Sequence, residues 1–595
     1  MSEEYSATYM ADFDFEEASD SEIKTLINKD FNNAESARQP REDLWREWYK
    51  IYRAYIENKS HGSNLFIPYA FQTIETIVPR IVGTLFSTRP YIGVLPLNKN
   101  AIESAKSLEN LIDYQLCQQM SFKAVAASWI KEALIYGTSI LKTGWEYEED
   151  EVVTPEPVAQ FLGFTIGTHL VRRVQTTKDQ PLIEHIDLWD FYVDPHATGI
   201  DDAEFVIHKS YRTLKYLRKM EEMDIYENID DLESNLMSEA YKTGRTERMS
   251  EIGIQQLDQP TEDKIEVLEY WKDDRVVVLA NREVVIRNIE NPFFHRKKPF
   301  IRLVDTPVPH EFYGIGEIEP IEHLQHELNS IRNQRMDNLN LVVNRMWKVL
   351  RGADIDYKQL VSRVGGIVEV DDMADLEPLD LQQVDYTSYQ EVEAIQKDID
   401  RTTGSYNYAR GEEADRRETA TTASILAQSA NERFDLKNEL MEDMGLKRLG
   451  QFLIQLNQQF IDEHKVIRIQ GEEGMHFQEI PPEEIRGSFD TMPLGSSISP
   501  AVNKEARLNN LINLYNHLRE SPYIHHPKMI KKILEAAEIK DVDSLLVEDA
   551  EEMLMEQMFG DITEEEVMAM GGQDPAQAPD MERMGMEGVM ENERG

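Results

Sequence analysis

Few residues of this chain have the types and spacing that catalysis or metal binding requires. His323 and His326, followed by Glu327, would share one helix face, because residues three positions apart are neighbours on a helix. The pair matches neither zinc-binding helix motif, H-E-x-x-H or H-x-x-E-H, and no cysteine or third histidine lies nearby. We interpret the two histidines as polar positions on a helix surface, with a metal-dependent nuclease or protease as the alternative.

Other catalytic signatures are missing or incomplete. The sequence contains no G-x-x-x-x-G-K-[ST] phosphate loop and no G-x-S-x-G nucleophile elbow. Gly314-Ile315-Gly316 is half of a dinucleotide-binding fingerprint and lacks its third glycine. Cys117 lies in a helical pattern, where an inert buried thiol is the usual outcome. We therefore expect no catalytic residue, no cofactor and no metal site.

The distribution of basic residues suggests a weaker kind of binding. Residues 331–348 contain a single acid, Asp337, and four basic residues: Arg332, Arg335, Arg345 and Lys348. Residues 410–418 contain four acids and three arginines: Arg410, Arg416 and Arg417. Both groups fit either a solvated surface or weak, sequence-independent contacts to nucleic-acid phosphates. The cluster HRKK at 295–298, close to two prolines, predicts an exposed turn.

The composition excludes several classes of protein. The chain has 595 residues, with 63 Lys and Arg against 110 Asp and Glu, so its formal net charge is −47. Such a surface repels phosphates and anionic lipids, which argues against a conventional binder of DNA, RNA or membrane surfaces. A single cysteine excludes an internal disulfide framework. Without an apolar run of about 18 residues or a signal-peptide pattern, we expect a large intracellular-type multidomain protein.

Helical and strand patterns alternate over the first 300 residues. Residues 1–35 contain ten acids and predict an unpacked acidic arm, whereas the aromatic residues between 44 and 55 predict a helix with one buried face. Further helices are expected up to Ser87 and across 101–136, with Gly137 as the stop. Strand patterns and a polar segment, which is either a helical insertion or a mobile loop, follow: strands at 138–149, 181–197 and 264–286, and the polar segment at 221–262.

Long helices dominate the second half. Residues 316–345 predict a rod of about 45 Å, followed by a short β-rich section and a helix over 388–403 that ends at Gly404. Residues 420–464 predict another long helix, with Gly445 and Gly450 as candidates for a bend. A second β section, short helices and an acidic, methionine-rich extension follow, at 465–500, 501–545 and 546–595.

The order of these segments resembles that of the portal proteins of tailed bacteriophages. The similarity covers about residues 40–500, and each segment is loose, but the order is hard to obtain by accident. The segments are, in order: NLFIPYAFQTIETIVPRIVGTLFSTRP, ALIYGTSILKTGWE, HIDLWDFYVDPHA, EYW, NPFFHRKKPF, YGIGEIEPIEHLQHELNSIRNQRMDN, GGIVEV, TTGSYNYARGEE and TATTAS.

The resemblance implies an α+β fold with a portal-like architecture. Periodicity alone, without the resemblance, also predicts both stem helices. By position, the implied layout is an acidic N-terminal arm (1–35), the first part of a wing (36–315), stem helix 1 (316–345), a clip (346–385), stem helix 2 (386–404), a tunnel loop (405–419), the rest of the wing (420–500), crown helices (501–545) and an acidic tail (546–595).

The resemblance also implies partners and a location. It implies a ring, usually of twelve copies, at one vertex of the capsid, through which double-stranded DNA passes without sequence specificity. The terminase large subunit would dock on the clip, head–tail adaptors would replace it, and major capsid and scaffolding proteins would hold the wing. The protein would belong to the virion, with assembly in the host cytoplasm and no membrane contact. The expected DNA-channel residues are Arg410, Arg416, Arg417, Arg332, Arg335, Arg345 and Lys348.

A second class of function stays open from the residues alone. The chain could be an acidic helical scaffold or adaptor that binds proteins only and has no channel. The β-rich section at 346–385 favours the portal, because a simple helical scaffold has no need of it.

Overall fold

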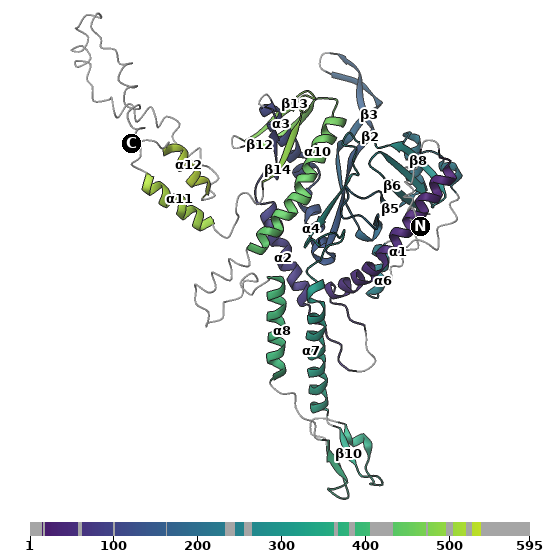
Figure 1. Ribbon diagram of the computed structural model, residues 1–595, viewed down its shortest axis with the longest axis vertical. Coiled ribbons are helices and arrows are strands. Elements are labelled where there is room, and N and C mark those ends of the chain that lie inside the picture. The colour runs from purple at the N-terminus through teal and green to yellow at the C-terminus, as the bar shows by residue number, and fades with distance from the viewer. Residues whose placement is uncertain are drawn as a thin grey trace, which may run out of the picture. The chain divides into compact units, whose positions relative to one another are not determined.

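The computed structural model describes residues 15, 18–57, 62–98, 101–161, 164–232, 244–254, 264–344, 346–361, 367–379, 387–404, 432–471, 474–494, 504–518 and 526–536. The chain divides into two units, residues 1–499 and 500–595. Helices and antiparallel sheets are mixed along the first unit (Figure 1), which confirms the expected α+β class. Within the described residues, no helix is both long enough and apolar enough to cross a membrane.

The first helix corrects the prediction of an unpacked arm over residues 1–35. Helix α1 (Asp20–Tyr52) begins at a capping box formed by Ser19 and Glu22. Its apolar residues recur at helical spacing and are fully buried against one face of a sheet: Ile23, Ile27 and Phe31. The acidic residues lie between these apolar positions. The number of acids alone therefore did not reveal that this helix is amphipathic. Residues 1–14 lie outside the described part of the chain.

The next elements follow the predicted boundaries closely. Helix α2 (Tyr69–Leu85) ends two residues before Ser87, and the extended piece after it is β1 (Ile92–Pro96). Helix α3 (Ile102–Tyr114) continues into a π-helical turn, η2 (Gln115–Gln119). Helix α4 (Phe122–Tyr136) then ends at Gly137, whose φ of 85° is the left-handed conformation expected of a glycine stop.

Two sheets follow in the chain. The first has the order β3-β2-β9, built from β2 (Thr138–Phe161), β3 (Phe164–Ile186) and β9 (Phe300–Val304). The second is antiparallel throughout, in the order β4 (Phe191–Val193), β5 (Val206–Thr213), β6 (Lys264–Trp271), β7 (Arg275–Ala280) and β8 (Val284–Glu290). Residues 264–286, which were predicted to form two strands, therefore contribute to three strands, β6, β7 and β8.

Two short helices lie between strands β5 and β6 of the second sheet in the chain. Helix α5 (Leu214–Glu222) follows β5, and α6 (Gly244–Glu251) lies within the polar segment 221–262, which favours its interpretation as a helical insertion. Residues 233–243 and 255–263 lie outside the described part. Short 3-10 turns also occur in the described part of the chain, at η3 (Leu188–Asp190) and η4 (Ile229–Asp231) and, further along, at η6 (Glu319–Ile321) and η7 (Tyr357–Leu360).

Two helices, α7 (Glu322–Val343) and α8 (Thr387–Thr403), lie side by side and run in opposite directions (Figure 1). Helix α8 ends at Gly404 with a φ of 71°, as predicted. Between the two helices, β10 (Trp347–Val349) pairs with β11 (Leu376–Pro378) over three residue pairs. Within the predicted β-rich section, the sequence IVEV at 367–370 lies outside the strands, and the second strand begins at Leu376.

The long helix predicted over 420–464 is described from residue 432 onward. Its first part, 432–441, is followed by a π-helical turn, η9 (Glu442–Leu446), and by α10 (Lys447–Phe460). Gly445 lies in the π-helical turn, a common site of helix distortion. The β section that follows contains β12 (Lys465–Gly471), β13 (Gly474–Ile480) and β14 (Phe489–Pro493), of which β14 pairs with β1.

The second unit contains two described helices. These are α11 (Lys504–Leu518) and α12 (His526–Ala536), which fall within the range predicted for short helices, 501–545. They contact each other. The acidic tail, 546–595, lies outside the described residues.

Candidate functional site

The α7–α8 pair brings together two of the predicted DNA-channel residues. Arg332 and Arg335, both partly exposed, line a hollow of about 410 Å³ together with Tyr389 at the start of α8. The Arg335 guanidinium lies 3.7 Å from the centroid of the Tyr389 ring, which is a cation–π contact. Lys348 lies elsewhere, exposed in β10 and opposite Glu377 in the strand register. The remaining candidates lie outside the described residues: Arg345, Arg410, Arg416 and Arg417.

The main polar feature of α7 was not predicted from the sequence. Four side chains of α7, each four residues from the next, bind the backbone of the segment 63–70. The acceptor contacts are Asp337 Oδ1 with Ser63 N (2.5 Å), Asn333 Oδ1 with Leu65 N (2.7 Å), Asn329 Oδ1 with Ile67 N (3.0 Å) and Gln325 Oε1 with Ala70 N (3.0 Å). Two amides also donate, Asn333 Nδ2 to Leu65 O (3.0 Å) and Gln325 Nε2 to Ile67 O (2.8 Å).

We call these contacts between α7 and the segment 63–70 the polar ladder. It forms because four residues of helix and two residues of extended chain span nearly the same length. Four residues of α-helix rise about 6 Å, and two residues of extended chain advance about 6.6 Å. Every second backbone amide from Ser63 to Ile67 therefore meets a new side chain of α7. The amides at 325, 329 and 333 are buried, so the ladder fixes the extended segment against the helix. The sequence signal was the strict four-residue spacing of polar side chains.

A buried charge cluster lies just before α7. The Lys437 ammonium contacts both oxygens of Asp305, at 2.8 and 3.0 Å, and also Glu317 Oε1. Burial, together with the Glu317 carboxylate, raises the pKa of Asp305 to about 7. Burial alone would lower the pKa of Lys437, but the two carboxylates hold it above its ordinary value. The cluster ties the helical residues 432–441 to the segment that leads into α7.

The glycines of the half-fingerprint have a packing role. A Cβ atom on Gly314 would lie 2.2 Å from Val304 Cγ1, and one on Gly316 would lie 2.7 Å from the carbonyl oxygen of Leu134. Gly137 contacts the same segment, since a Cβ atom placed on Gly137 would lie 2.1 Å from Gly314 O. The glycines therefore permit close backbone contact between the end of α4 and the chain entering α7, which accounts for them without a nucleotide.

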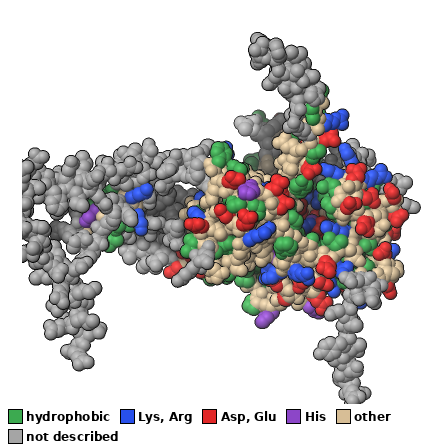
Figure 2. Space-filling view, turned by 90° about the horizontal axis from the view of Figure 1, so that it is seen from above, with side chains coloured by type: hydrophobic (Ala, Val, Ile, Leu, Met, Phe, Trp, Pro, Cys, Tyr) green, Lys and Arg blue, Asp and Glu red, His purple; other side chains and the backbone are tan. Residues whose placement is uncertain are grey.

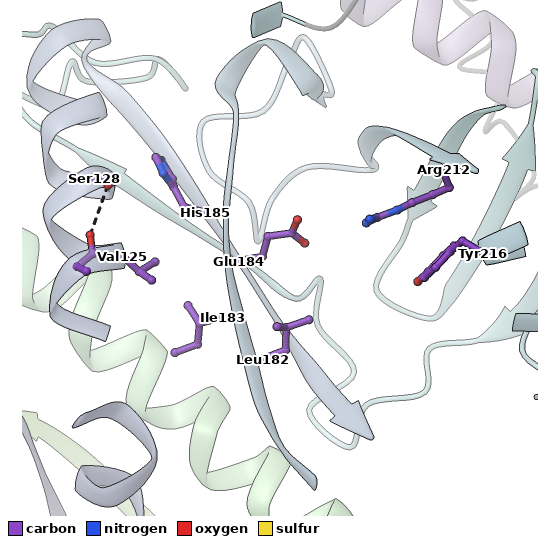
Figure 3. Close-up of a pocket in the computed structure, with 9 residues that line it drawn as sticks. Val125, Ser128, Leu182, Ile183, Glu184, His185, Arg212 and Tyr216 are labelled. Carbon is purple, nitrogen blue, oxygen red and sulfur yellow. Dashed lines mark hydrogen bonds between the residues drawn. The ribbon is translucent and has the colours of Figure 1, made fainter. Parts of the chain in front are cut away.

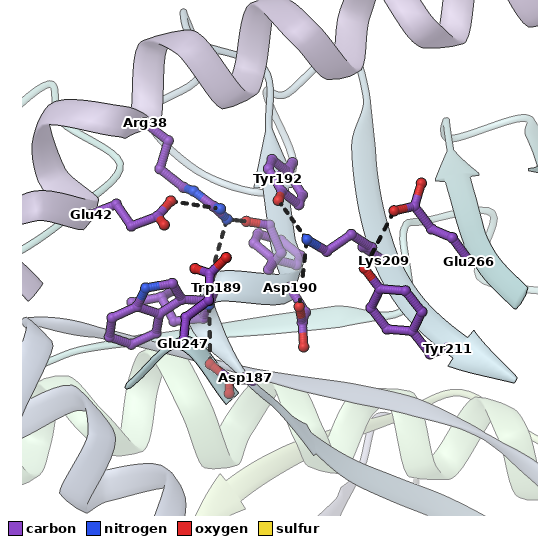
Figure 4. A network of polar contacts seen from close by, with 12 residues as sticks. Arg38, Glu42, Asp187, Trp189, Asp190, Tyr192, Lys209, Tyr211, Glu247 and Glu266 are labelled. Carbon is purple, nitrogen blue, oxygen red and sulfur yellow. Dashed lines mark hydrogen bonds and ion pairs between the residues drawn. The ribbon is translucent and has the colours of Figure 1, made fainter. Parts of the chain in front are cut away.

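A second polar network pins α1 and α6 to the residues around η3 (Figure 4). The buried Arg38 guanidinium of α1 donates to the carbonyl oxygens of Leu188 (3.3 Å) and Phe191 (2.7 Å). Arg248 of α6 makes two hydrogen bonds to Asp187, at 2.9 and 2.6 Å. Burial raises the pKa of nearby Asp190 to about 7. These contacts position the two helices against the residues around η3.

His185, which lines the hollow of about 660 Å³ in Figure 3, belongs to a trio that resembles a catalytic triad in composition. His185 Nε2 lies 2.8 Å from Glu132 Oε2 and 3.1 Å from Ser139 Oγ. A hydrolase triad needs the serine and the acid on opposite nitrogens of the ring, whereas here one nitrogen meets both. Burial alone would lower the pKa of His185, but Glu132 raises it. This trio therefore acts as a polar packing cluster.

The other residues considered for chemistry have ordinary surroundings. His323 and His326 are exposed on α7, as expected. Across the described residues, no three His, Cys, Asp or Glu side chains gather closely enough to hold a metal ion. The Cys117 thiol is half-buried and donates to Asp113 Oδ1 at 3.3 Å, and burial raises its pKa to about 11. Such a thiol is a poor nucleophile.

The basic turn at 295–298 is less exposed than the sequence predicted. Lys298 is buried, with 1% of its side chain exposed, and pairs with Asp273 Oδ1 at 2.8 Å. His295 stacks on Phe452, with ring centroids 4.6 Å apart, and burial lowers its pKa to about 4. The prediction of an exposed turn is therefore wrong for these two residues, because their charge and ring are satisfied inside the fold.

Comparison with protein families decides the identity. The family model described as phage SU10 portal protein matches residues 23–162 and 162–592 of this chain. The chain belongs to this portal protein family. The resemblance to tailed-phage portal proteins is thereby confirmed, and the match extends past the span of 40–500 that sequence inspection suggested, in both directions. The α7–α8 pair and the buried clusters at its base thus belong to a phage portal protein.

Proposed function

We propose that this portal protein assembles into a closed ring whose central channel carries double-stranded DNA into and out of the capsid. The observation that supports the proposal best is the α7–α8 pair, two antiparallel helices joined by a segment that contains β10 and β11, within a chain matched by a portal family model. In this proposal α7 and α8 are the stem, residues 346–385 the clip and residues 405–419 the tunnel loop.

The rest of the chain would then hold the ring in place. Residues 36–315 and 420–500 would form the wing, in contact with major capsid and scaffolding proteins, and residues 501–545 the crown. The terminase large subunit would dock on the clip during packaging, and head–tail adaptors would follow it. The protein would supply no chemistry of its own, since the energy for translocation would come from the terminase.

The charge of the chain suits a conduit. Twelve copies at −47 each would carry 12 × −47 = −564 charges in total. The face in Figure 2 has carboxylates spread among fewer basic side chains. A wall of this sign keeps DNA from adhering, and each phosphate that a basic residue neutralises adds affinity that translocation must overcome. Few basic residues in the channel, such as Arg332 and Arg335, would therefore guide DNA without holding it.

Electron microscopy combined with native mass spectrometry of the purified protein tests the proposal. We expect a closed ring of about twelve subunits, in line with the closed symmetry of most homo-oligomers, and a channel wide enough for duplex DNA. A monomer, dimer or filament at every salt concentration would overturn the ring and would favour an acidic scaffold that binds proteins only.

A further inference from the structure

Strands β2 and β3 form a ribbon that continues beyond the rest of their sheet. Strand β9 pairs with β2 only over residues 138–142, whereas β2 and β3 pair with each other up to Phe161 and Phe164 (Figure 1). Both outer edges of the ribbon are therefore unpaired within the described residues. A two-stranded ribbon alone is marginally stable, and open edges are sites where other chains attach.

The base of the ribbon is held firmly to the body of the first unit. The Trp145 ring stacks on Phe460 of α10, with centroids 5.1 Å apart and planes 18° apart. Trp145 Nε1 also donates to Asp179 Oδ1 at 2.8 Å, and Lys465 pairs with Asp179. These contacts end where the exposed part of the ribbon begins, so the two open edges start from a fixed point.

The two edges carry opposite charge. On β2, residues 146–153 contain five acids and no base; on β3, residues 170–178 contain three bases and no acid. The acids are Glu146, Glu148, Glu149, Asp150 and Glu151, and the bases are Arg172, Arg173 and Lys178. The ribbon is therefore acidic along one edge and basic along the other.

Ion pairs within the ribbon join some of these charges, and the paired side chains are still partly or largely exposed to solvent. Lys178 contacts Glu146 at 2.9 Å and Glu148 at 3.1 Å, and Arg172 contacts Glu151 at 3.6 Å. The Arg172 and Glu151 side chains are 77% and 65% exposed, and such exposed pairs contribute little. Hydroxyl groups also bind two of the acids: Tyr147 contacts Glu149, and Thr177 contacts Asp150 at 2.8 Å.

Apolar side chains are exposed on one face of the same stretch. Val153 is directly opposite Arg172 in the register, so Leu170 and Val174 are its diagonal neighbours on that face. Leu170 and Val174 are 73% and 63% exposed, and Val153 is 49% exposed. Exposed apolar groups beside complementary charge are features of a surface that a partner covers.

We propose that this ribbon is a contact between copies of the chain, in which the acidic β2 edge of one copy meets the basic β3 edge of the next. Joining two β2 edges would place ten acids together, so the charges disfavour a two-fold dimer and favour a head-to-tail contact. Contacts of this kind generate closed rings when the rotation closes. The inference rests on the proposed ring, for which it names the surface involved.

Prolines limit how the two edges meet. Pro155 and Pro157 lie in β2, and a proline inside a paired strand must turn its missing N–H away from its partner strand. The outer edge of β2 therefore lacks donors at these two positions. The contact is accordingly restricted to residues 146–153 and depends on side chains more than on a continuous strand ladder.

Two charge-reversed proteins test the contact when they are mixed. E149K/D150K/E151K makes both edges basic, and R172E/R173E/K178E makes both edges acidic. Each protein alone should lose at least tenfold in the fraction of assembled ring, by native mass spectrometry at equal concentration. An equimolar mixture should recover assembly as mixed rings that contain both variants, because basic and acidic ribbons can alternate.

Mixing separates contacts between chains from effects within one chain, since ion pairs inside each ribbon stay broken in the mixture. E222K/E283K/E463K, which reverses three exposed acids elsewhere, is the matched control and should assemble normally. Wild-type assembly by each reversed protein alone, or a mixture that assembles no better than its parts, would overturn the ribbon contact while leaving the ring proposal intact. A wild-type protein that never forms rings would instead overturn the proposed function.

Discussion

The side chain of Asn333 satisfies both backbone groups of Leu65: its Oδ1 accepts from Leu65 N at 2.7 Å and its Nδ2 donates to Leu65 O at 3.0 Å. A side-chain amide copies here what a neighbouring β-strand would do. Because Asn333 is 92% buried, water cannot easily replace either bond.

Replacing this amide should therefore destabilise the first unit. We expect N333L to lower the free energy of unfolding by about 1–3 kcal/mol, because the Leu65 N–H and C=O lose their partners in a part-buried site. Chemical denaturation followed by circular dichroism measures this. N340A, at an exposed asparagine of the same helix, is the control and should change stability by less than about 0.5 kcal/mol. Equal effects of the two variants would contradict the role given to the ladder.

The Lys437 cluster predicts a larger effect. K437M would leave Asp305 and Glu317 buried without a cation, which should cost about 3–5 kcal/mol. K397M removes an ion pair whose partners are more than half exposed, and should cost less than about 1 kcal/mol. Denaturation of both variants under the same conditions compares them, and a mild K437M phenotype would mean that water reaches the cluster.

The raised pKa of Asp305 predicts a specific pH dependence. The unfolded carboxyl has its ordinary pKa near 3.8, whereas the folded one is near 7, so the folded state binds the extra proton between these values. The contribution of Asp305 to stability is therefore full below about pH 4 and is lost as the pH rises through 7. D305N removes this titration, so its stability relative to wild type should improve from pH 4.5 to 7.5. Thermal unfolding at fixed protein concentration checks the difference, and parallel pH profiles would rule it out.

Two glycines should respond oppositely to alanine. G314A forces a Cβ to within 2.2 Å of Val304 and 2.7 Å of the Thr306 carbonyl oxygen, so we expect a loss of about 1–3 kcal/mol or more, or insoluble protein. A Cβ on Gly83, in the last turn of α2, meets nothing within 4 Å, and G83A should gain about 0.4–1 kcal/mol. Soluble yield and melting temperature separate the two variants, and a neutral G314A would show that the two segments can move apart.

The arginines of residues 405–419 carry the functional prediction. We expect R410A/R416A/R417A to assemble into rings and yet to alter DNA packaging or retention, because weak phosphate contacts would be lost without loss of packing. Packaging assays with nuclease protection of the encapsidated DNA measure this. R218A/R296A/R486A, at three exposed arginines, is the control for total charge. Normal packaging and retention by assembled rings would exclude the loop arginines as DNA contacts.

Sequence patterns predicted the elements whose ends depend on local chemistry. The stops at Gly137 and Gly404 followed from the left-handed conformation that glycine adopts easily, and both glycines have positive φ values. The α7–α8 pair followed from apolar periodicity, and the likeness of the segment order to portal proteins was confirmed by the family match.

Features that depend on distant partners were not predictable in this way. The ladder on α7 uses polar residues that look like a solvated helix face, until the segment 63–70 covers them. Lys298 looks exposed in the sequence and is buried through its pairing with Asp273. In both cases a polar side chain became internal because a partner far away in the sequence satisfied it, which composition and periodicity do not encode.

The ladder on α7 also implies a rule about which changes the segment 63–67 can accept. Its contacts go to main-chain atoms, so they are indifferent to the side chains that this segment carries. They are sensitive to its length, because one inserted residue would turn the bonded amides away from the helix and move the rest by half a repeat. Helix α7 thus fixes the number of residues in the segment beside it, whereas the side chains of that segment can be substituted.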